Sequence, residues 1–300
     1  MNGLTRRKFA DNQDYLAMRE MLIDGYLRTG KPCNMLFYYL DNWRFANGDE
    51  PHGFFADRAV LWCDGDRVAA FSILDNESLY NLQVHPQYAK IVPVILEFLT
   101  QTQAASKTAI YAYQSQIAKY LEPFCFCSPE HINNEYEYDL TTDAVEVFEL
   151  PDGYKIYTAD QLDDLRSVYK AKALAFPRPH MTEAAVEPRM ALKQDAPSYS
   201  NDGVYTVIRE ADRACVSFAE AWFDPISGVV GFEPIGTIPE ERKKGLCKAL
   251  LSYVFKRCRE AGYQKISIRT GENFESAANY LYRSLSPVNV FPVMEYGLRE

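Results

Sequence analysis

The sequence predicts a mixed α+β protein built from two similar units. Three observations predict this class. Helical and strand-like patterns alternate along the 300 residues, their order restarts near the middle, and 47 % of the residues are apolar, which is enough for packed cores. We therefore expect a domain boundary near residue 145, with domains at 1–145 and 146–300.

The first unit is predicted to start with a helix and continue with short strands. Apolar side chains recur at mostly helical spacing after Asp11, a candidate cap, and Gly30 suits the end of this helix. The dipeptide Asp64-Gly65 indicates a tight hairpin. The expected elements are helices at 11–28, 35–45, 89–103 and just before residue 121, and strands at 59–63, 67–74, 79–84, 108–113 and 135–140.

The second unit repeats this order. A proline-rich crossing separates its first helix from its later strands, and Gly262 is placed to cap its last long helix. The expected elements are a strand at 154–158, a helix at 160–175, strands at 204–209, 214–223 and 229–236, and an amphipathic helix that follows Gly245.

Two pairs of short segments can be superposed between the units. Residues 66–71 resemble 212–218, and Val84-His-Pro86 resembles Thr237-Ile-Pro239. The matching prolines stand about half the chain apart, which indicates a tandem duplication. After the proline, only the second copy has the sequence Glu-Glu-Arg-Lys-Lys-Gly. Chemistry that depends on this loop is therefore expected in the second unit alone.

Charge and cysteine content narrow the function classes. The formal charge is -9, with 41 acidic and 32 basic residues, whereas nucleic acids and anionic membranes require an extended positive surface. No window approaches the roughly 20 apolar residues of a membrane span, and the first residues lack a signal-peptide pattern. Seven irregularly spaced cysteines favour free thiols over disulfides or a metal site. We expect a cytoplasmic monomer or homodimer without a metal, bound to neither nucleic acid nor membrane.

The segment 231–247 carries the strongest functional signal. A strand, a basic loop and the start of a helix follow one another, and this order gathers backbone N–H groups into an anion site. Arg242, Lys243 and Lys244 place three cations at the positive end of the helix dipole, which is unfavourable unless an anion binds there. Gly245 would let the backbone approach that anion. The alternative is a solvated charge run ahead of a surface helix.

This loop resembles the cofactor loop of the GNAT superfamily, the acetyl-CoA-dependent N-acetyltransferases. The family signature is Arg or Gln, two residues, Gly, one residue, then Gly or Ala, and Arg242-Lys-Lys-Gly245-Leu-Cys247 departs from it only at Cys247. Residues 233–239 resemble the family's central strand, and 271–285 resemble the motif of the next helix. The resemblance implies two GNAT-like domains, each with a twisted, mostly antiparallel sheet flanked by helices, of which the first is degenerate.

The resemblance also implies that acetyl-CoA is the acetyl donor. Its pantetheine arm would lie along the central strand and bind the backbone there, and its pyrophosphate would contact the loop amides. Asn273 and Asn279 are either cofactor ligands or local caps. The implied cofactor-binding residues are Ile235, Thr237, Arg242, Lys243, Lys244, Gly245, Leu246, Cys247 and Asn273.

Two residues are candidates for proton transfer. An acceptor amine with a pKa of about 10 is mostly ammonium at neutral pH and needs a base. Glu233 stands where some family members hold that base, and Tyr282 matches the family position of the acid that protonates the leaving thiolate. The alternatives are local pairing for Glu233 and packing against the sheet for Tyr282. Cys247 is not expected to act as a nucleophile, because the family transfers the acetyl group directly.

The predicted function is transfer of the acetyl group of acetyl-CoA directly to a primary amine of a small molecule or peptide. A non-catalytic CoA-binding regulatory or scaffold module is the alternative. A transferase that uses aminoacyl-tRNA is a third hypothesis, which the acidic charge and the intact loop disfavour. The sequence leaves the acceptor open.

Overall fold

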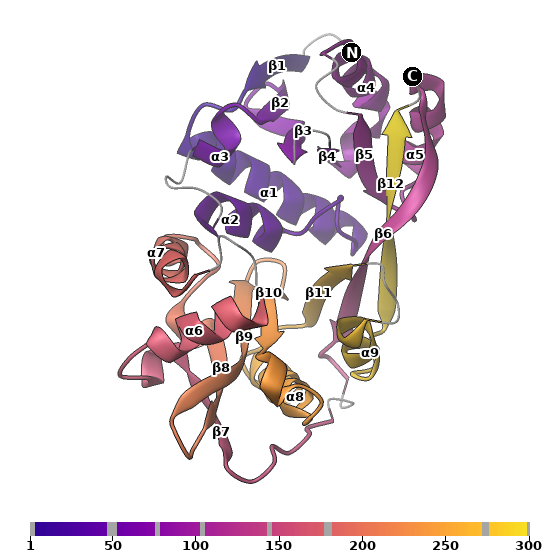
Figure 1. Cartoon of the computed structure of the whole chain (residues 1–300). Helices are drawn as coiled ribbons and strands as arrows, with labels where there is room; N and C mark the ends of the chain where they lie inside the picture. Colours follow the sequence, from indigo (N-terminus) through magenta and orange to yellow (C-terminus); the bar gives the residue numbers. More distant parts are fainter. Residues whose placement is uncertain are drawn as a thin grey trace.

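The computed structural model describes residues 4–46, 53–75, 79–102, 106–142, 146–176, 182–271 and 276–298. Within them, the strands of both halves form one continuous 12-stranded sheet with helices packed against it (Figure 1). The fold is mixed α/β and mostly antiparallel, as the sequence predicts.

The first half follows the predicted order closely. The first helix begins because the carboxylate of Asp11 accepts a 2.8 Å hydrogen bond from the amide of Gln13, and it ends at Gly30, which has a φ of 66°. The elements are β1 (Leu4–Lys8), α1 (Asn12–Thr29), α2 (Phe37–Ala46), α3 (Gly53–Ala56), β2 (Ala59–Asp64), β3 (Arg67–Asp75), β4 (Leu79–Val84), the 3-10 helix η1 (Pro86–Ile91), α4 (Val92–Thr102), β5 (Lys107–Tyr111), α5 (Ser115–Leu121), η2 (Glu122–Phe124) and β6 (Phe126–Asp139).

The second half departs from the prediction at two helices and at its last two strands, residues 265–271 and 289–298, which were not predicted. A 3-10 turn precedes the helix predicted at 160–175, which begins only at Arg166. The proline-rich crossing contains an unpredicted helix, capped by Thr182 and including Pro188. The elements are β7 (Tyr154–Thr158), η3 (Ala159–Gln161), α6 (Arg166–Ala175), α7 (Glu183–Lys193), η4 (Asn201–Gly203), β8 (Val204–Arg209), β9 (Ala214–Asp224), β10 (Val229–Thr237), η5 (Pro239–Glu241), α8 (Leu246–Glu260), β11 (Lys265–Gly271), α9 (Ala277–Arg283) and β12 (Asn289–Leu298).

The two halves exchange strands. The sheet order is β1-β2-β3-β4-β5-β12-β6-β11-β10-β9-β8-β7, so the last strand of the chain lies between β5 and β6 of the first half. β12 pairs with β5 around Val293 and Tyr111, and β6 pairs with β11 around Tyr138 and Ile266. Each half therefore completes the sheet of the other.

The boundary predicted near residue 145 stays a prediction. Residues 143–145 lie outside the described residues, and β6, which precedes them, pairs with β11, which follows them. The strands of the two halves therefore do not separate at one point in the chain.

One hydrophobic core spans both halves. It joins Tyr15 and Tyr38 of the first half to Met190 and Trp222 of the second. Polar contacts reinforce this interface at Asp41 of α2. Its buried carboxylate accepts hydrogen bonds from Tyr15 Oη at 2.6 Å, from Arg19 Nε at 3.1 Å and from the hydroxyl of Ser198 in the second half. The first half is thus held firmly against the face of β9 and β10.

Candidate functional site

The candidate site begins where β10 separates from β11. The two strands pair in parallel only from Val229 to Gly231, although β10 continues to Thr237. Ile238 donates its amide to Val216 of β9 at 3.0 Å. Because backbone groups alternate along a strand, those of Ile235 and Thr237 face away from β9, toward the edge that β11 leaves. This is the backbone that the sequence assigns to pantetheine.

The loop after β10 curls into an anion-binding conformation. Lys243 and Gly245 both lie in the left-handed region, with φ of 63° and 81°. Such turns, followed by the first turn of a helix, point successive N–H groups toward one place. A Cβ at Gly245 would meet no atom within 4 Å, so glycine is required there by backbone conformation. The amides of Leu246 and Cys247 belong to this first turn of α8.

The cations of the loop are only partly available to an anion. Arg242 donates from Nε to the carbonyl of Thr237 at 3.1 Å and from Nη2 to that of Ala175 at 3.2 Å, so it ties the loop to β10 and α6. Lys244 pairs with Glu241 at 2.8 Å, and Glu241 also binds Arg209 at 2.7 Å. The sequence predicts that a ligand is the counter-ion of these cations, but for Lys244 the protein supplies the counter-ion through Glu241.

Glu233 lies in a bulge of β10. The register against β9 shifts between Phe232 and Ile235, and the indole Nε1 of Trp222 donates to the carbonyl of Glu233 at 2.7 Å. Its side chain is half-buried and lies near Lys193 of α7. Burial lowers the pKa of Lys193 to about 8, and the Glu233 charge opposes that change.

Tyr282 is buried on α9 and is close to Glu233. Burial raises the pKa of its phenol well above the ordinary value, and the nearby Cys247 and Glu233 raise it further by smaller amounts. The backbone of Tyr282 is fixed, because its carbonyl accepts a 2.8 Å hydrogen bond from Tyr138 Oη. The charge of Glu233 therefore acts on Tyr282, and Tyr282 keeps its proton at neutral pH.

Cys247 shares this neighbourhood as a neutral thiol. Burial raises its pKa to about 11, although the hydroxyls of Thr237 and Ser217 oppose the change. These two hydroxyls also bind each other across β9 and β10 at 2.8 Å. A thiol with this pKa is a poor nucleophile at neutral pH, despite its place at a helix N-terminus.

Of the two asparagines considered as cofactor ligands or local caps, the structure describes only Asn279. Asn273 lies outside the described residues. Asn279 is fully buried, donates to the carbonyl of Gly271 at 2.8 Å and to Ser276 Oγ at 3.0 Å, and accepts from Tyr136 Oη at 2.5 Å. These bonds fix the start of α9 against β11, which corresponds to the local role that the sequence left open.

Buried ionic groups near the site were missed by the sequence analysis. Lys193 pairs with Glu220 of β9 at 2.8 Å, and Lys172 of α6 contacts the same carboxylate. All three side chains are buried. No sequence signal indicated them, because α7 itself was hidden by prolines and the strand around Glu220 appears otherwise apolar.

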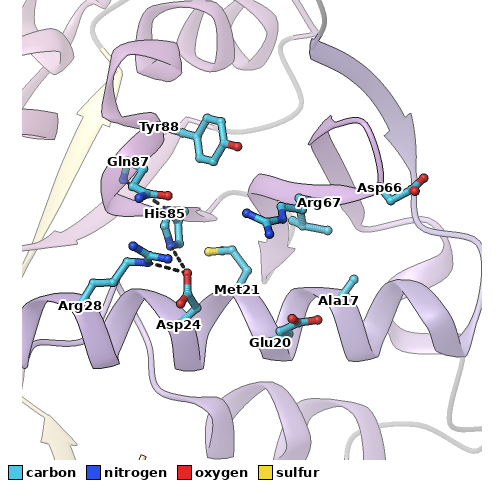
Figure 2. Close-up of a pocket in the computed structure, with 11 residues that line it drawn as sticks. Ala17, Glu20, Met21, Asp24, Arg28, Asp66, Arg67, His85, Gln87 and Tyr88 are labelled. Atoms are coloured by element: carbon cyan, nitrogen blue, oxygen red, sulfur yellow. Dashed lines mark hydrogen bonds and ion pairs between the residues drawn. The ribbon is translucent and has the colours of Figure 1, made fainter.

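A separate cavity lies in the first half. It has a volume of about 180 Å³ between α1, the start of β3 and η1. Figure 2 shows the carboxylate of Asp24 between Arg28 and His85, which it contacts at 2.7 and 2.8 Å. His85 precedes Pro86 as Ile238 precedes Pro239, so this cavity adjoins the first-half counterpart of the loop that follows β10.

The described residues contain neither a metal cluster nor a membrane-spanning helix. No group of three or more His, Cys, Asp or Glu side chains is placed there to hold a metal ion. Among the described helices, none combines the length and the apolar character that a membrane crossing requires.

Comparisons with known proteins agree with this geometry. Residues 165–286 match the model of the acetyltransferase (GNAT) family. A GCN5-related N-acetyltransferase from Sphaerobacter thermophilus has a TM-score of 0.62 at 16 % identity, covering 100 % of this chain and 97 % of that chain. A search of curated proteins finds no match.

Two more solved structures resemble the whole chain. A tandem GNAT protein from the clavulanic acid biosynthesis pathway has a TM-score of 0.62 at 14 % identity, covering 99 % of each chain. A GNAT-family acetyltransferase from Colwellia psychrerythraea has a TM-score of 0.66 at 10 % identity, covering 98 % of this chain and 100 % of that one. Residues 165–286 therefore resemble the GNAT acetyltransferase domain, and the chain as a whole has the fold of these solved proteins.

Proposed function

We propose that this protein is an acetyl-CoA-dependent N-acetyltransferase whose active site lies in the second half. It moves the acetyl group directly to a primary amine of a small molecule or peptide. The observation that carries the proposal is the loop from Arg242 to Cys247, in which two left-handed residues precede α8 directly after the strand that parts from β11.

The residues present fit the cofactor. The amides of 243–247 would hold the pyrophosphate, Lys243 would add charge at the surface, and the backbone of Ile235 and Thr237 would hold pantetheine. Arg242 acts mainly by shaping the loop, since its guanidinium binds protein carbonyls. When bound, acetyl-CoA supplies a thioester as the acetyl donor.

Two side chains of the protein are proposed to transfer the two protons of the reaction. Glu233 accepts the proton of the acceptor ammonium, directly or through water, and Trp222 holds its backbone. Tyr282 is protonated at neutral pH, because burial raises its pKa, and it is the proposed proton donor to the leaving thiolate. The electrostatic coupling between Glu233 and Tyr282 supports these roles.

A second candidate function is a CoA-binding module without turnover. The ring of Tyr38 packs directly over Gly231, where an added Cβ would lie 2.0 Å from its Cδ1. First-half side chains therefore cover part of the face on which an acceptor would approach. This packing is the observation that favours a regulatory or scaffold role.

The deciding experiment measures thiol release from acetyl-CoA over a panel of amines, together with CoA affinity. The transferase predicts turnover with at least one amine class, and Tyr282→Phe should slow turnover while leaving CoA affinity nearly intact. Arg242→Glu should abolish CoA binding, because it breaks both hydrogen bonds of the loop and adds a negative charge. Tight CoA binding without turnover by any amine would favour the module. Unchanged CoA affinity in Arg242→Glu would overturn the site.

A further inference from the structure

The first half contains a counterpart of the proposed cofactor groove. β4 pairs in parallel with β5 over three positions, from Leu79 with Lys107 to Asn81 with Ala109, and the pairing then ends. β10 and β11 likewise pair over three positions before they part. The duplication therefore reproduces the opening into which the second half is proposed to take pantetheine.

The chain itself fills this opening. The side-chain amide of Asn34 donates to the carbonyl of Leu82 on β4 and accepts from the amide of Tyr111 on β5 at 3.1 Å. The backbone amide of Asn34 donates to Gln83 Oε1 at 2.7 Å. These bonds bridge the two strands just beyond their last pair, where a pantetheine amide would otherwise bind. Asn34 is buried, so these are interior contacts.

The neighbouring residues hold the 32–34 segment in place. Tyr113 Oη donates to the carbonyl of Pro32 at 2.5 Å, and Gln114 Nε2 donates to that of Cys33. Gly25 of α1 permits this packing, because a Cβ there would lie 2.7 Å from Cys33 Sγ. The segment is thus fixed by α1 and by the residues after β5.

The loop that would bind pyrophosphate is also altered. Residues 86–91 form η1, which leads directly into α4 at Val92, and none of them has a positive φ. The second-half loop instead turns through two left-handed residues, Lys243 and Gly245. The first half therefore lacks the conformation that gathers amides toward an anion.

We infer that the 32–34 segment is a built-in occupant of the first-half groove, so that each chain binds one CoA, in the second half. This inference rests on the proposed function for the identity of the ligand. Beside the segment, a pocket of about 220 Å³ remains, lined in part by Lys31, Cys33 and Gln114. That volume is below the roughly 300–1,000 Å³ of typical ligand sites.

The first test counts bound CoA by calorimetric titration and native mass spectrometry of the full chain. One CoA per chain is expected, with none bound to Arg242→Glu. Two CoA per chain, or one that persists in Arg242→Glu, would overturn the inference. Absence of any CoA binding would contradict the proposed function instead, and the occupant is then tested by the second experiment, which needs no ligand.

The second test follows hydrogen exchange at the amide of Tyr111. Asn34→Ala removes its acceptor and should speed exchange about tenfold or more. Asn34→Asp keeps an acceptor for the Tyr111 amide and should therefore exchange slowly, like the unsubstituted chain. This variant separates loss of the hydrogen bond from poor folding of the alanine variant. Lys31→Ala is the matched control, since its exposed side chain lies over the ring of Tyr113 and its hydrogen bonds to Thr29 come from the backbone, and it should leave exchange unchanged. Equal exchange in the Asn34→Ala variant and the unsubstituted chain would overturn the inference.

Discussion

The indole Nε1–H of Trp222 donates a 2.7 Å hydrogen bond to the carbonyl oxygen of Glu233. Trp222 lies opposite Gly231 in the β9–β10 register, and Glu233 lies in the bulge that follows. A bulge removes a backbone group from the ladder, and here the indole supplies the missing donor. Trp222 therefore positions the strand segment that carries the proposed base.

Replacing Trp222 by Phe should slow catalysis without loss of cofactor binding. The ring is largely retained, but the carbonyl of Glu233 loses its donor, at a cost of about 1–3 kcal/mol. Because small displacements of a base reduce turnover strongly, we expect kcat to fall on the order of tenfold, with little change in CoA affinity. Steady-state kinetics and calorimetry measure the two quantities.

The control for this variant is Trp62→Phe, a change at a buried tryptophan of β2 in the first half. It should cost stability without a selective fall in kcat. Equal kcat in Trp222→Phe and the unsubstituted chain would contradict the positioning role.

Gly245→Ala should weaken CoA binding. At φ 81° a Cβ costs about 1–2 kcal/mol, so the loop must either carry this strain or change conformation. A change of that size corresponds to a fall in affinity of roughly tenfold. Gly65→Ala is a matched control, because Gly65 also has a positive φ, 60°, and open space around it, but lies in the first-half hairpin. If both variants lower affinity equally, the loop geometry is not what binds the cofactor.

Glu241 should stabilise the protein in a pH-dependent way. Burial alone would raise the pKa of Glu241, but hydrogen bonds from Lys244, Tyr154 and Arg209 outweigh it and hold the pKa below its ordinary 4.5. A lowered folded-state pKa gives stability that is fully present above the unfolded-state pKa and is lost as the pH falls through the folded-state value.

The variant Glu241→Gln tests this stabilisation. We expect it to lose about 1–3 kcal/mol of unfolding free energy at pH 7, and the difference from the unsubstituted chain should shrink below about pH 4.5. Denaturant titrations at several pH values measure it. Glu240→Gln, at the exposed neighbour, should show neither effect. A difference that stays constant down to pH 3 would contradict this account.

The thiol of Cys247 should react slowly with alkylating reagents, although it lies in the proposed site. With a pKa of about 11, roughly one thiol in a thousand is ionised at pH 8. Iodoacetamide should therefore label exposed Cys125 well before Cys247, and labelling of Cys247 should rise about tenfold per pH unit up to pH 11. Peptide mass spectrometry follows both sites. Cys247→Ala should keep most of the turnover, and its loss would indicate a covalent role.

The features that are local in sequence could be predicted. The left-handed turn of the 242–247 loop depends on a short run of residues and requires Gly245, which the sequence shows directly. The counter-ion of Lys244 was missed, because Glu241 was seen only as part of a charge run. Its burial, which makes the pair strong, depends on Tyr154 and Arg209 from distant strands.

The features that depend on distant partners could not be predicted. β12 was not expected, because its pairing with β5 joins residues that lie far apart in the chain. The contact between Asn34 and β4 could not be predicted from the sequence either, because a single polar residue in a loop forms no periodic pattern. Likewise, α7 was hidden because Pro188 and its neighbours resemble a connection.

The strand exchange also bears on how the protein is made. A ribosome releases the first half long before Val293 and its neighbours in β12 have been synthesised. Until then, the edge of β5 that faces away from β4 has no partner, and β6 lacks its partner strand β11. The nascent chain must therefore keep two open strand edges protected from other chains while the second half is translated, and the sheet can close only after nearly all of the described sequence has emerged.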